Sequence, residues 1–103
     1  MRGFDFNGVV DTGRPGLQPK EDDVIITGNT FPTEIFDYLD SHKLRCPVYF
    51  PPDKRYANKR YAVAVWKSEM IRRLNLDTFY EDDPTQGEII AESCPDCKVV
   101  IIT

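Results

Sequence analysis

The sequence has little of what secreted and membrane proteins need. Only 3 of its 103 residues are cysteine, an odd number that argues against a framework of disulfides. No apolar run approaches the roughly 20 residues of a membrane span. The N-terminus also shows no cationic region followed by an apolar stretch and a small-residue cleavage site. We therefore expect a cytoplasmic protein that does not enter a membrane.

An excess of positive charge is also missing. The 17 acidic residues outnumber the 13 basic ones, which gives a formal net charge of -4 at pH 7. Such a chain does not bind nucleic acid through its overall charge, so any basic face has to be judged locally. With 41% hydrophobic residues, 103 residues can bury one core and are too few for two. We expect a single domain over residues 1–103.

Five short runs rich in β-branched or aromatic residues are each bounded by turn residues, as is typical of strands. Between them, apolar residues recur at helical spacing in three segments. Pro32 suits a first helical turn and Asn58 a helix N-cap. The expected strands are 2–6, 23–28, 46–50, 77–81 and 98–103, and the expected helices are 30–43, 58–76 and 84–93. The apolar stripe expected on the second helix is Ala62, Val65, Trp66, Ile71 and Leu74.

This order of elements predicts the fold class. Strands that alternate with helices favour an α/β fold, in which helices cover a parallel sheet and the crossovers are right-handed. The first crossover is an exception, because residues 9–23 contain Gly-rich turns and prolines and show no helical period. We expect a loop there, and one face of the sheet with one helix fewer.

Polar side chains stand where three of the expected strands end. Asp5 and Asn7 follow the first, Thr27 ends the second, and Asp82 and Asp83 follow the fourth. Ligands of open parallel sheets bind beyond the carboxyl ends of the strands, so these side chains should share a cleft. Clustered carboxylates repel one another unless a cation neutralises them, and oxygen ligands of this kind suit Mg²⁺.

These motifs resemble those of the haloacid dehalogenase (HAD) superfamily of aspartate-nucleophile phosphohydrolases. "FDFNGVV" is similar to the first motif, "VIITGN" to the second, and "EDD" to the acidic fourth motif. The third motif is a single lysine, for which Lys59 stands at the usual distance and Lys54 and Lys67 are rivals. The resemblance covers nearly the whole chain. It implies a three-layer fold around a five-stranded parallel sheet in the order 5-4-1-2-3, without a cap domain.

The resemblance also implies a role for each residue. Asp5 would attack a phosphoryl group and form an aspartyl-phosphate. Thr27 would hydrogen-bond the phosphoryl oxygens, and Lys59 would neutralise negative charge and keep Asp5 ionised. The metal would be Mg²⁺, held by Asp5, the main-chain carbonyl of Asn7, and one or both of Asp82 and Asp83.

Asn7 departs from the family pattern. HAD phosphatases have an acid at this position, which protonates the leaving group and then activates water, and an amide does neither. General acid–base catalysis is typically worth ~10²–10⁴-fold, so the sequence predicts a slow Mg²⁺-dependent phosphohydrolase. The alternative is an inactive HAD-like binding or regulatory module. Because Asn7 precedes a glycine, it is prone to deamidation, which would restore an acid at this position.

The expected substrate is a phosphorylated molecule. Capless relatives tend to have open clefts that suit macromolecules. The segment from Lys54 to Arg73 carries seven basic residues and one acid, interleaved with Tyr56, Tyr61 and Trp66. Basic and aromatic residues together would suit a nucleic-acid end, whereas the simpler interpretation is a solvated helix face. The oligomeric state stays open.

The cysteines allow three interpretations. Cys94 and Cys97, together with His42 and Cys46, offer four ligands of the kind that zinc prefers. The family's strand order places the two pairs on opposite outer strands, about 19 Å apart at ~4.8 Å per strand, which argues against zinc within one chain. A redox role of Cys94 and Cys97, or a purely structural one, remains.

Overall fold

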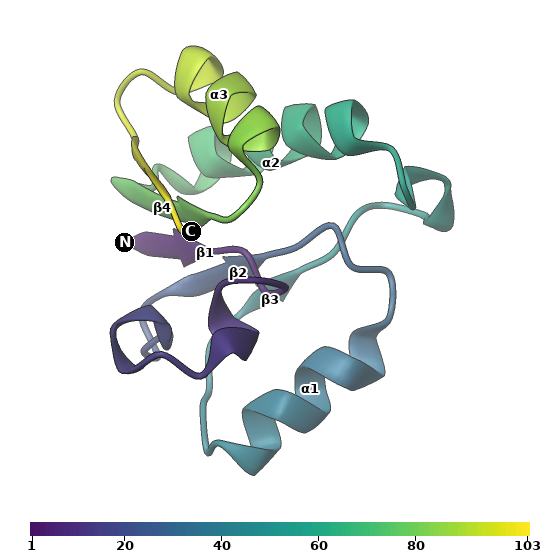
Figure 1. Ribbon diagram of the computed structural model, residues 1–103, viewed down its shortest axis with the longest axis vertical. Helices are drawn as coiled ribbons and strands as arrows, with labels where there is room; N and C mark the ends of the chain where they lie inside the picture. The colour runs from purple at the N-terminus through teal and green to yellow at the C-terminus, as the bar shows by residue number, and fades with distance from the viewer.

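The computed structural model describes residues 1–103, and the five expected strands form one parallel sheet (Figure 1). The strands are shorter than expected: β1 is Arg2–Phe4, β2 Val24–Ile26, β3 Val48–Tyr49, β4 Thr78–Glu81 and β5 Lys98–Ile101. Their order is β3-β2-β1-β4-β5, and every neighbouring pair is parallel. The predicted Rossmann-like α/β architecture and its strand order are therefore confirmed.

Three helices cover the two faces of this sheet. Helices α2, Arg60–Leu74, and α3, Pro84–Ser93, lie together on one face, and α1, Pro32–Ser41, lies on the other (Figure 1). Pro32 and Pro84 each occupy a first helical position, where the missing N–H costs no hydrogen bond. None of the helices is both long and apolar enough to span a membrane.

Alternate residues of the strands pack into two separate cores, one on each face of the sheet. In β2, Ile25 belongs to the core under α1, whereas Val24 and Ile26 belong to the core under α2 and α3. All three side chains are buried, as expected for a central parallel strand that is covered on both faces. The residues at the ends of these strands therefore stand on a backbone that is held from both sides.

The loop that was expected in place of a helix fills part of the core under α1. It contains two short 3₁₀ helices, Val10–Thr12 and Pro15–Leu17. Val10 and Leu17 are buried against that core. The Tyr38 hydroxyl of α1 donates a hydrogen bond of 2.9 Å to the Val10 carbonyl and so ties the loop to the helix. The loop thus covers the sheet where most parallel crossovers use a helix.

Helix α2 is rotated relative to our expectation. Val65 is 44% exposed, and the buried face is Val63, Ala64, Trp66, Lys67, Ser68 and Ile71. The helix begins at Arg60 with Lys59 as the N-cap, whereas Asn58 adopts a left-handed conformation with φ of 61° and does not cap it. Trp66 and Ile71 of the expected stripe are buried and Leu74 packs against the same core, but Val65 is exposed and Lys67 is buried instead. The expected cap was wrong.

The loop's contribution to stability can be measured with a pair of identical substitutions. We expect Val10→Ala, at a fully buried position, to lower the free energy of unfolding by about 2 kcal/mol. Val65→Ala, at an exposed helical position, should change it by less than about 0.5 kcal/mol. Urea unfolding of both variants checks this, and equal losses would show that the loop does not belong to the core.

Candidate functional site

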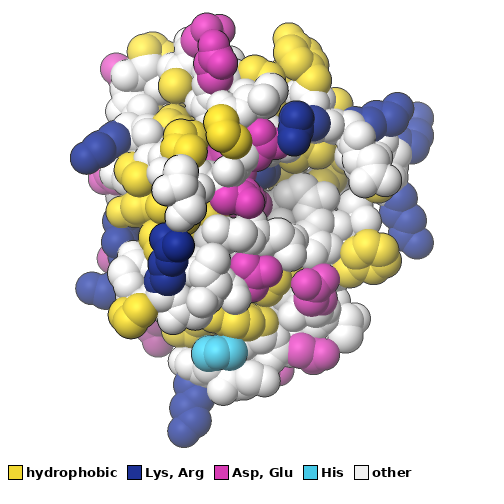
Figure 2. Space-filling model, viewed as in Figure 1, with side chains coloured by type: hydrophobic (Ala, Val, Ile, Leu, Met, Phe, Trp, Pro, Cys, Tyr) yellow, Lys and Arg dark blue, Asp and Glu magenta, His cyan; other side chains and the backbone are white.

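A cleft of about 850 Å³ opens at the carboxyl ends of β1, β2 and β4. Only 2 of its 16 lining residues are hydrophobic, so it suits a charged or strongly polar ligand. Figure 2 shows this side of the molecule hollowed, with acidic side chains beside the hollow and Lys and Arg side chains around its edge. The cleft lies where the strand-end rule places ligands.

The sheet itself positions Asp5 and Thr27. The Asp5 N–H donates to the Tyr80 carbonyl at 2.9 Å, and the Thr27 N–H donates to the Tyr49 carbonyl at 3.1 Å. Each bond continues the parallel ladder one residue beyond a strand, which fixes both backbones at the floor of the cleft. The Thr27 hydroxyl oxygen accepts from the Asn29 N–H at 3.0 Å, so its proton is free to donate to a ligand.

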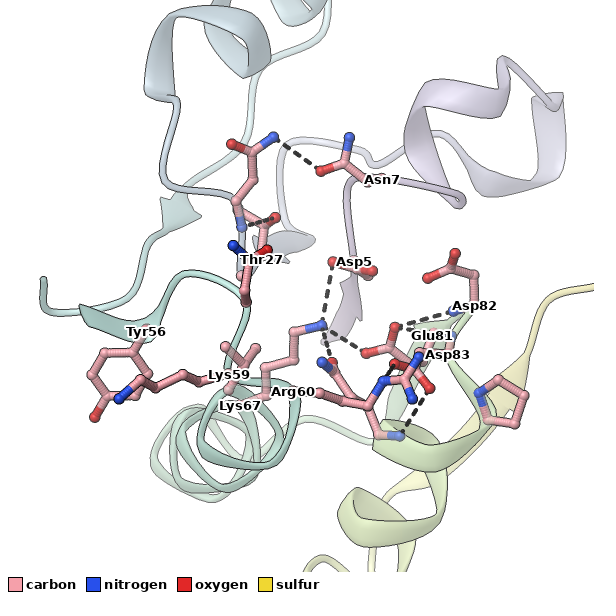
Figure 3. Close-up of a pocket in the computed structure, with 16 residues that line it drawn as sticks. Asp5, Asn7, Thr27, Tyr56, Lys59, Arg60, Lys67, Glu81, Asp82 and Asp83 are labelled. Carbon is pink, nitrogen blue, oxygen red and sulfur yellow. Dashed lines mark hydrogen bonds and ion pairs between the residues drawn. The ribbon is translucent and has the colours of Figure 1, made fainter. Parts of the chain in front are cut away.

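A buried lysine stands at the centre of the site. Lys67 Nζ lies 2.7 Å from Glu81 Oε1, 2.9 Å from Gln86 Oε1 and 3.3 Å from Asp5 Oδ1 (Figure 3). An ammonium group has three protons, and here each has an acceptor. Only 2% of the Lys67 side chain is exposed. The lysine therefore joins α2, β4, α3 and the end of β1 at a single point.

Glu81 is the partner that the sequence analysis missed. It is 1% exposed, and its second oxygen, Oε2, accepts hydrogen bonds from the main-chain N–H groups of Asp82 and Asp83 at 3.1 and 3.3 Å. In β4, Phe79 and Glu81 are buried while Thr78 and Tyr80 are only partly so. This period of two places Glu81 on the same face as Phe79, which is the face that α2 covers.

Lys67, not Lys59, is the lysine in contact with Asp5. Lys59 lines the cleft, but it is exposed, and Figure 3 shows its side chain running away from Asp5. Of the three lysines considered from the sequence, the rival Lys67 rather than Lys59 therefore stands beside Asp5. Because the N-terminus of α2 stands at the mouth of the cleft, a residue two turns into the helix reaches the strand ends.

Three carboxylates come together beside Lys67. Oxygens of Asp5, Glu81 and Asp82 all lie within 4.8 Å of one another, and no other group of three or more His, Cys, Asp or Glu side chains could hold a metal ion. Asp83 is outside this group. It caps α3 by accepting from the Thr85 N–H at 2.9 Å, and it pairs with Arg60 at 2.7 Å.

The electrostatics of this acidic cluster call for a cation. Burial raises the pKa of Asp5 well above its usual range, Lys67 offsets only part of this rise, and the nearby Glu81 carboxylate adds to it. Burial also raises the pKa of Asp82. Burial alone would lower the pKa of Lys67, but Asp5 and Glu81 outweigh that effect and raise it. One ammonium faces three carboxylates, so a divalent cation would relieve the remaining repulsion, and hard oxygen ligands fit such an ion.

Gly8 lets the loop after β1 lie directly on the acidic cluster. Its φ is 79°, and a Cβ at this position would collide with the Asp82 carboxylate. Only glycine meets both conditions without strain. The main chain of Asn7 and Gly8 is therefore held against one of the three carboxylates.

The Asn7 side chain is held by its neighbours in the loops. Its Oδ1 accepts from Asn29 Nδ2 at 2.9 Å (Figure 3), and its Nδ2 donates to Asp11 Oδ2 at 3.4 Å. Asn7 lines the cleft and is exposed to solvent. The structure thus brings Asp5, Asn7, Thr27 and Asp82 into one cleft, as expected from the strand ends.

The cysteines lie away from this cleft. All three are free, and Cys94 and Cys97 are buried in the core under α2 and α3. Burial raises the pKa of Cys46 and that of Cys97 to about 11 each, so both thiols are protonated at neutral pH. A protonated thiol is a poor nucleophile, which favours a structural role over a redox one.

No protein-family model, curated protein or solved structure gives a significant match to this chain.

Matched substitutions of the two lysines test which of them supports the site. Lys67→Met removes the only cation among buried carboxylates, and we expect it to lower the free energy of unfolding by about 3–5 kcal/mol. Lys59→Met, at an exposed position, should change it by less than about 0.5 kcal/mol. Urea unfolding measures both, and a larger loss for Lys59→Met would contradict the geometry.

Asp82 and Asp83 can be separated by their response to a metal ion. An ion that binds only the folded protein adds about 2.7 kcal/mol to the free energy of unfolding when its free concentration is about 100 times its dissociation constant. We expect Mg²⁺ to raise the melting temperature of the wild-type protein and of Asp83→Asn, in which asparagine still caps α3. Asp82→Asn should abolish most of the rise. Thermal unfolding with and without Mg²⁺ checks this, and the reverse pattern would place the ion at Asp83.

Proposed function

We propose that the protein is a Mg²⁺-dependent phosphomonoesterase of the HAD type, with Asp5 as its nucleophile. The observation that carries the proposal is the setting of Asp5. It is a nearly buried carboxylate at the end of β1, with Lys67 on one side and the acidic cluster on the other. Thr27 adds a free hydroxyl proton from the end of β2. A phosphoryl group is the ligand that would use all three.

The donor set supports a hard divalent cation. Asp5 and Asp82 would hold it together with the main-chain carbonyl of Asn7, while both oxygens of Glu81 are already engaged by Lys67 and two main-chain N–H groups. When bound, Mg²⁺ supplies positive charge to the phosphoryl oxygens and keeps Asp5 ionised. Mg²⁺ is our choice because carboxylate, carbonyl and water oxygens are its usual ligands.

Asp5 would carry the chemistry in two steps. A carboxylate oxygen of Asp5 forms a bond to phosphorus as the bond to the leaving oxygen breaks, which gives an aspartyl-phosphate and an alkoxide or alcohol. Water then attacks the same phosphorus, releases inorganic phosphate and restores the Asp5 carboxylate. Lys67 holds Asp5 in place through their 3.3 Å ion pair, and Thr27 donates to a phosphoryl oxygen.

Asn7 limits the rate of both steps. The leaving oxygen has to take its proton from water, and the attacking water has no carboxylate to receive its own. The nearby acids Asp11 and Glu34 do not replace it, because neither of them lines the cleft. We therefore propose slow turnover, with preference for leaving groups that need no proton.

The residues at the edge of the cleft favour a large phosphorylated molecule as the substrate. Tyr56, Lys59 and Arg60 line the cleft where α2 begins. Arg60 is paired with Asp83, but Lys59 has no ion-pair partner. A cation and an aromatic ring beside a phosphoryl site suit a nucleic-acid end, whose next phosphate and base would lie there. This substrate class is part of the proposal.

A second candidate function is recognition without turnover. The observation that favours it is the amide of Asn7, held between Asn29 and Asp11 at the place where an acid would act. A binding module needs the lysine, the cation and Thr27, and it needs no acid.

Phosphate release separates the two candidates. We expect slow, Mg²⁺-dependent release from a panel of phosphomonoesters that includes 3′- and 5′-phosphorylated oligonucleotides. Asp5→Asn should abolish it, because the nucleophile is lost. Asn7→Asp should raise it by about 10²-fold or more, because an acid is restored.

The matched control is Asn75→Asp, which makes the same change at an exposed residue where α2 ends. It should leave the rate unchanged. A silent wild-type protein that Asn7→Asp activates would favour the binding module. A rate that survives Asp5→Asn would overturn the nucleophile assignment.

A further inference from the structure

The hydrogen bonds around Asn7 fix the orientation of its amide. Asn29 Oδ1 accepts from the Phe31 N–H at 2.7 Å, so the Asn29 nitrogen has to face the other way. That nitrogen donates to Glu34 and to Asn7 Oδ1. The oxygen of Asn7 therefore faces Asn29, and its nitrogen faces Asp11.

One carboxylate bridges the two nitrogens that matter for deamidation. Asp11 Oδ1 accepts from the Gly8 N–H at 2.7 Å, and Asp11 Oδ2 accepts from Asn7 Nδ2 at 3.4 Å. In deamidation, the main-chain nitrogen that follows an asparagine attacks the side-chain carbonyl, and the side-chain nitrogen leaves as ammonia. Asp11 thus contacts both the attacking and the leaving nitrogen. Asn29 contacts the carbonyl oxygen, on which negative charge develops.

We propose that Asn7 is a self-processing site, at which Asp11 and Asn29 promote a deamidation that converts Asn7 to aspartate. Gly8 contributes by having no side chain to hinder the attack. Asn7 and Asp11 are both exposed, so water reaches the reacting atoms. The other asparagines, Asn29, Asn58 and Asn75, are not followed by glycine.

The reaction needs only water. The Gly8 nitrogen forms a bond to the Asn7 side-chain carbon while its proton passes to Asp11, and the Asn7 oxygen takes the negative charge beside the Asn29 amide. The carbon–nitrogen bond to the side-chain nitrogen then breaks. That nitrogen takes the proton from Asp11 and leaves as ammonia, and a cyclic imide remains. One water adds to the side-chain carbonyl of the imide and opens it to aspartate, and the Gly8 N–H is restored.

The surroundings of Gly8 favour aspartate over isoaspartate. The isomer would add a carbon to the main chain between residues 7 and 8, where Gly8 lies directly on the Asp82 carboxylate without room even for a Cβ. Opening at the side-chain carbonyl leaves the main chain as it was and re-forms the hydrogen bond from Gly8 to Asp11.

The consequence for activity rests on the proposed function. Aspartate at position 7 would supply the acid that the cleft lacks, so ageing of the chain would turn a slow phosphatase into a faster one. The chemical change itself does not depend on that function and is measured separately.

The experiment compares the folded protein with a peptide of residues 3–13 at neutral pH. The product at position 7 is followed by mass spectrometry of proteolytic fragments, after chromatography that separates fragments with aspartate from those with isoaspartate, because the two have the same mass. General acid–base help is typically worth ~10²–10⁴-fold, so we expect the folded chain to deamidate at least about tenfold faster than the peptide. The other asparagines should stay intact.

Two variants test the cause of this acceleration. Asp11→Asn keeps an oxygen that accepts from the Gly8 N–H but cannot take up a proton, and it should slow the reaction to about the rate of the peptide. Asn29→Ala should slow it as well, by removing the donor to the carbonyl oxygen. Circular dichroism shows whether both variants are folded, and either of them suffices if the other is not.

The outcomes separate this proposal from the proposed function. A folded chain that deamidates no faster than the peptide, a rate that neither variant changes, or isoaspartate as the main product overturns the self-processing site. If aspartate forms as expected while Asn7→Asp releases no phosphate, the self-processing site stands and the phosphatase falls. If aged wild-type protein reaches the activity of Asn7→Asp, both proposals are supported.

Discussion

The fold and the site depend on one buried charge. The Lys67 ammonium has almost no access to water, so its cost of burial is tolerable only while Asp5, Glu81 and Gln86 all accept from it. Those acceptors come from the end of β1, the end of β4 and the first turn of α3. The lysine comes from two turns inside α2. The need to satisfy one ammonium group therefore sets the rotation of α2 and brings together three elements that are distant in the sequence.

The charge of the same site is not balanced, because one lysine cannot neutralise three carboxylates. Asp5 and Asp82 both have raised pKa values, which shows that their ionised forms are unfavourable in the protein alone. A fully apolar or fully paired arrangement would be more stable, and sites that act on ligands commonly give up stability in this way. A cation bound to the carboxylate oxygens would relieve this repulsion. Stability and metal binding would then be coupled through the same side chains.

The α/β class could be predicted from the alternation of strand and helix patterns, whereas the order of the strands was expected only from the resemblance of the motifs to the HAD superfamily. Asp5, Thr27 and Asp82 could be predicted because strand ends in a parallel sheet converge at one edge. Lys67 was named only as a rival of Lys59, because the helical stripe was counted through Val65, although Lys67 stands four residues from both Val63 and Ile71, which are buried. Glu81 was missed because an acid inside a strand has a meaning only once its partner is known. Side-chain pairing between distant elements is the part that sequence periodicity does not contain.

The acidic side chains near Asn7 already have other partners in the structure. An acid at this edge cannot come from Asp83, which caps α3, or from Glu81, whose oxygens serve Lys67 and the start of the turn. Asp11 and Glu34 are engaged in holding the loops that carry Asn7 and Asn29. In the proposed phosphatase, position 7 is therefore the place from which a proton would have to be given to the leaving group. The contacts that hold an amide there, one donor on its oxygen and one carboxylate shared by its nitrogen and the next N–H, are also the contacts that would convert it into an acid. Under the proposed deamidation, the presence of an acid at position 7 would depend on the age of the chain as well as on its sequence.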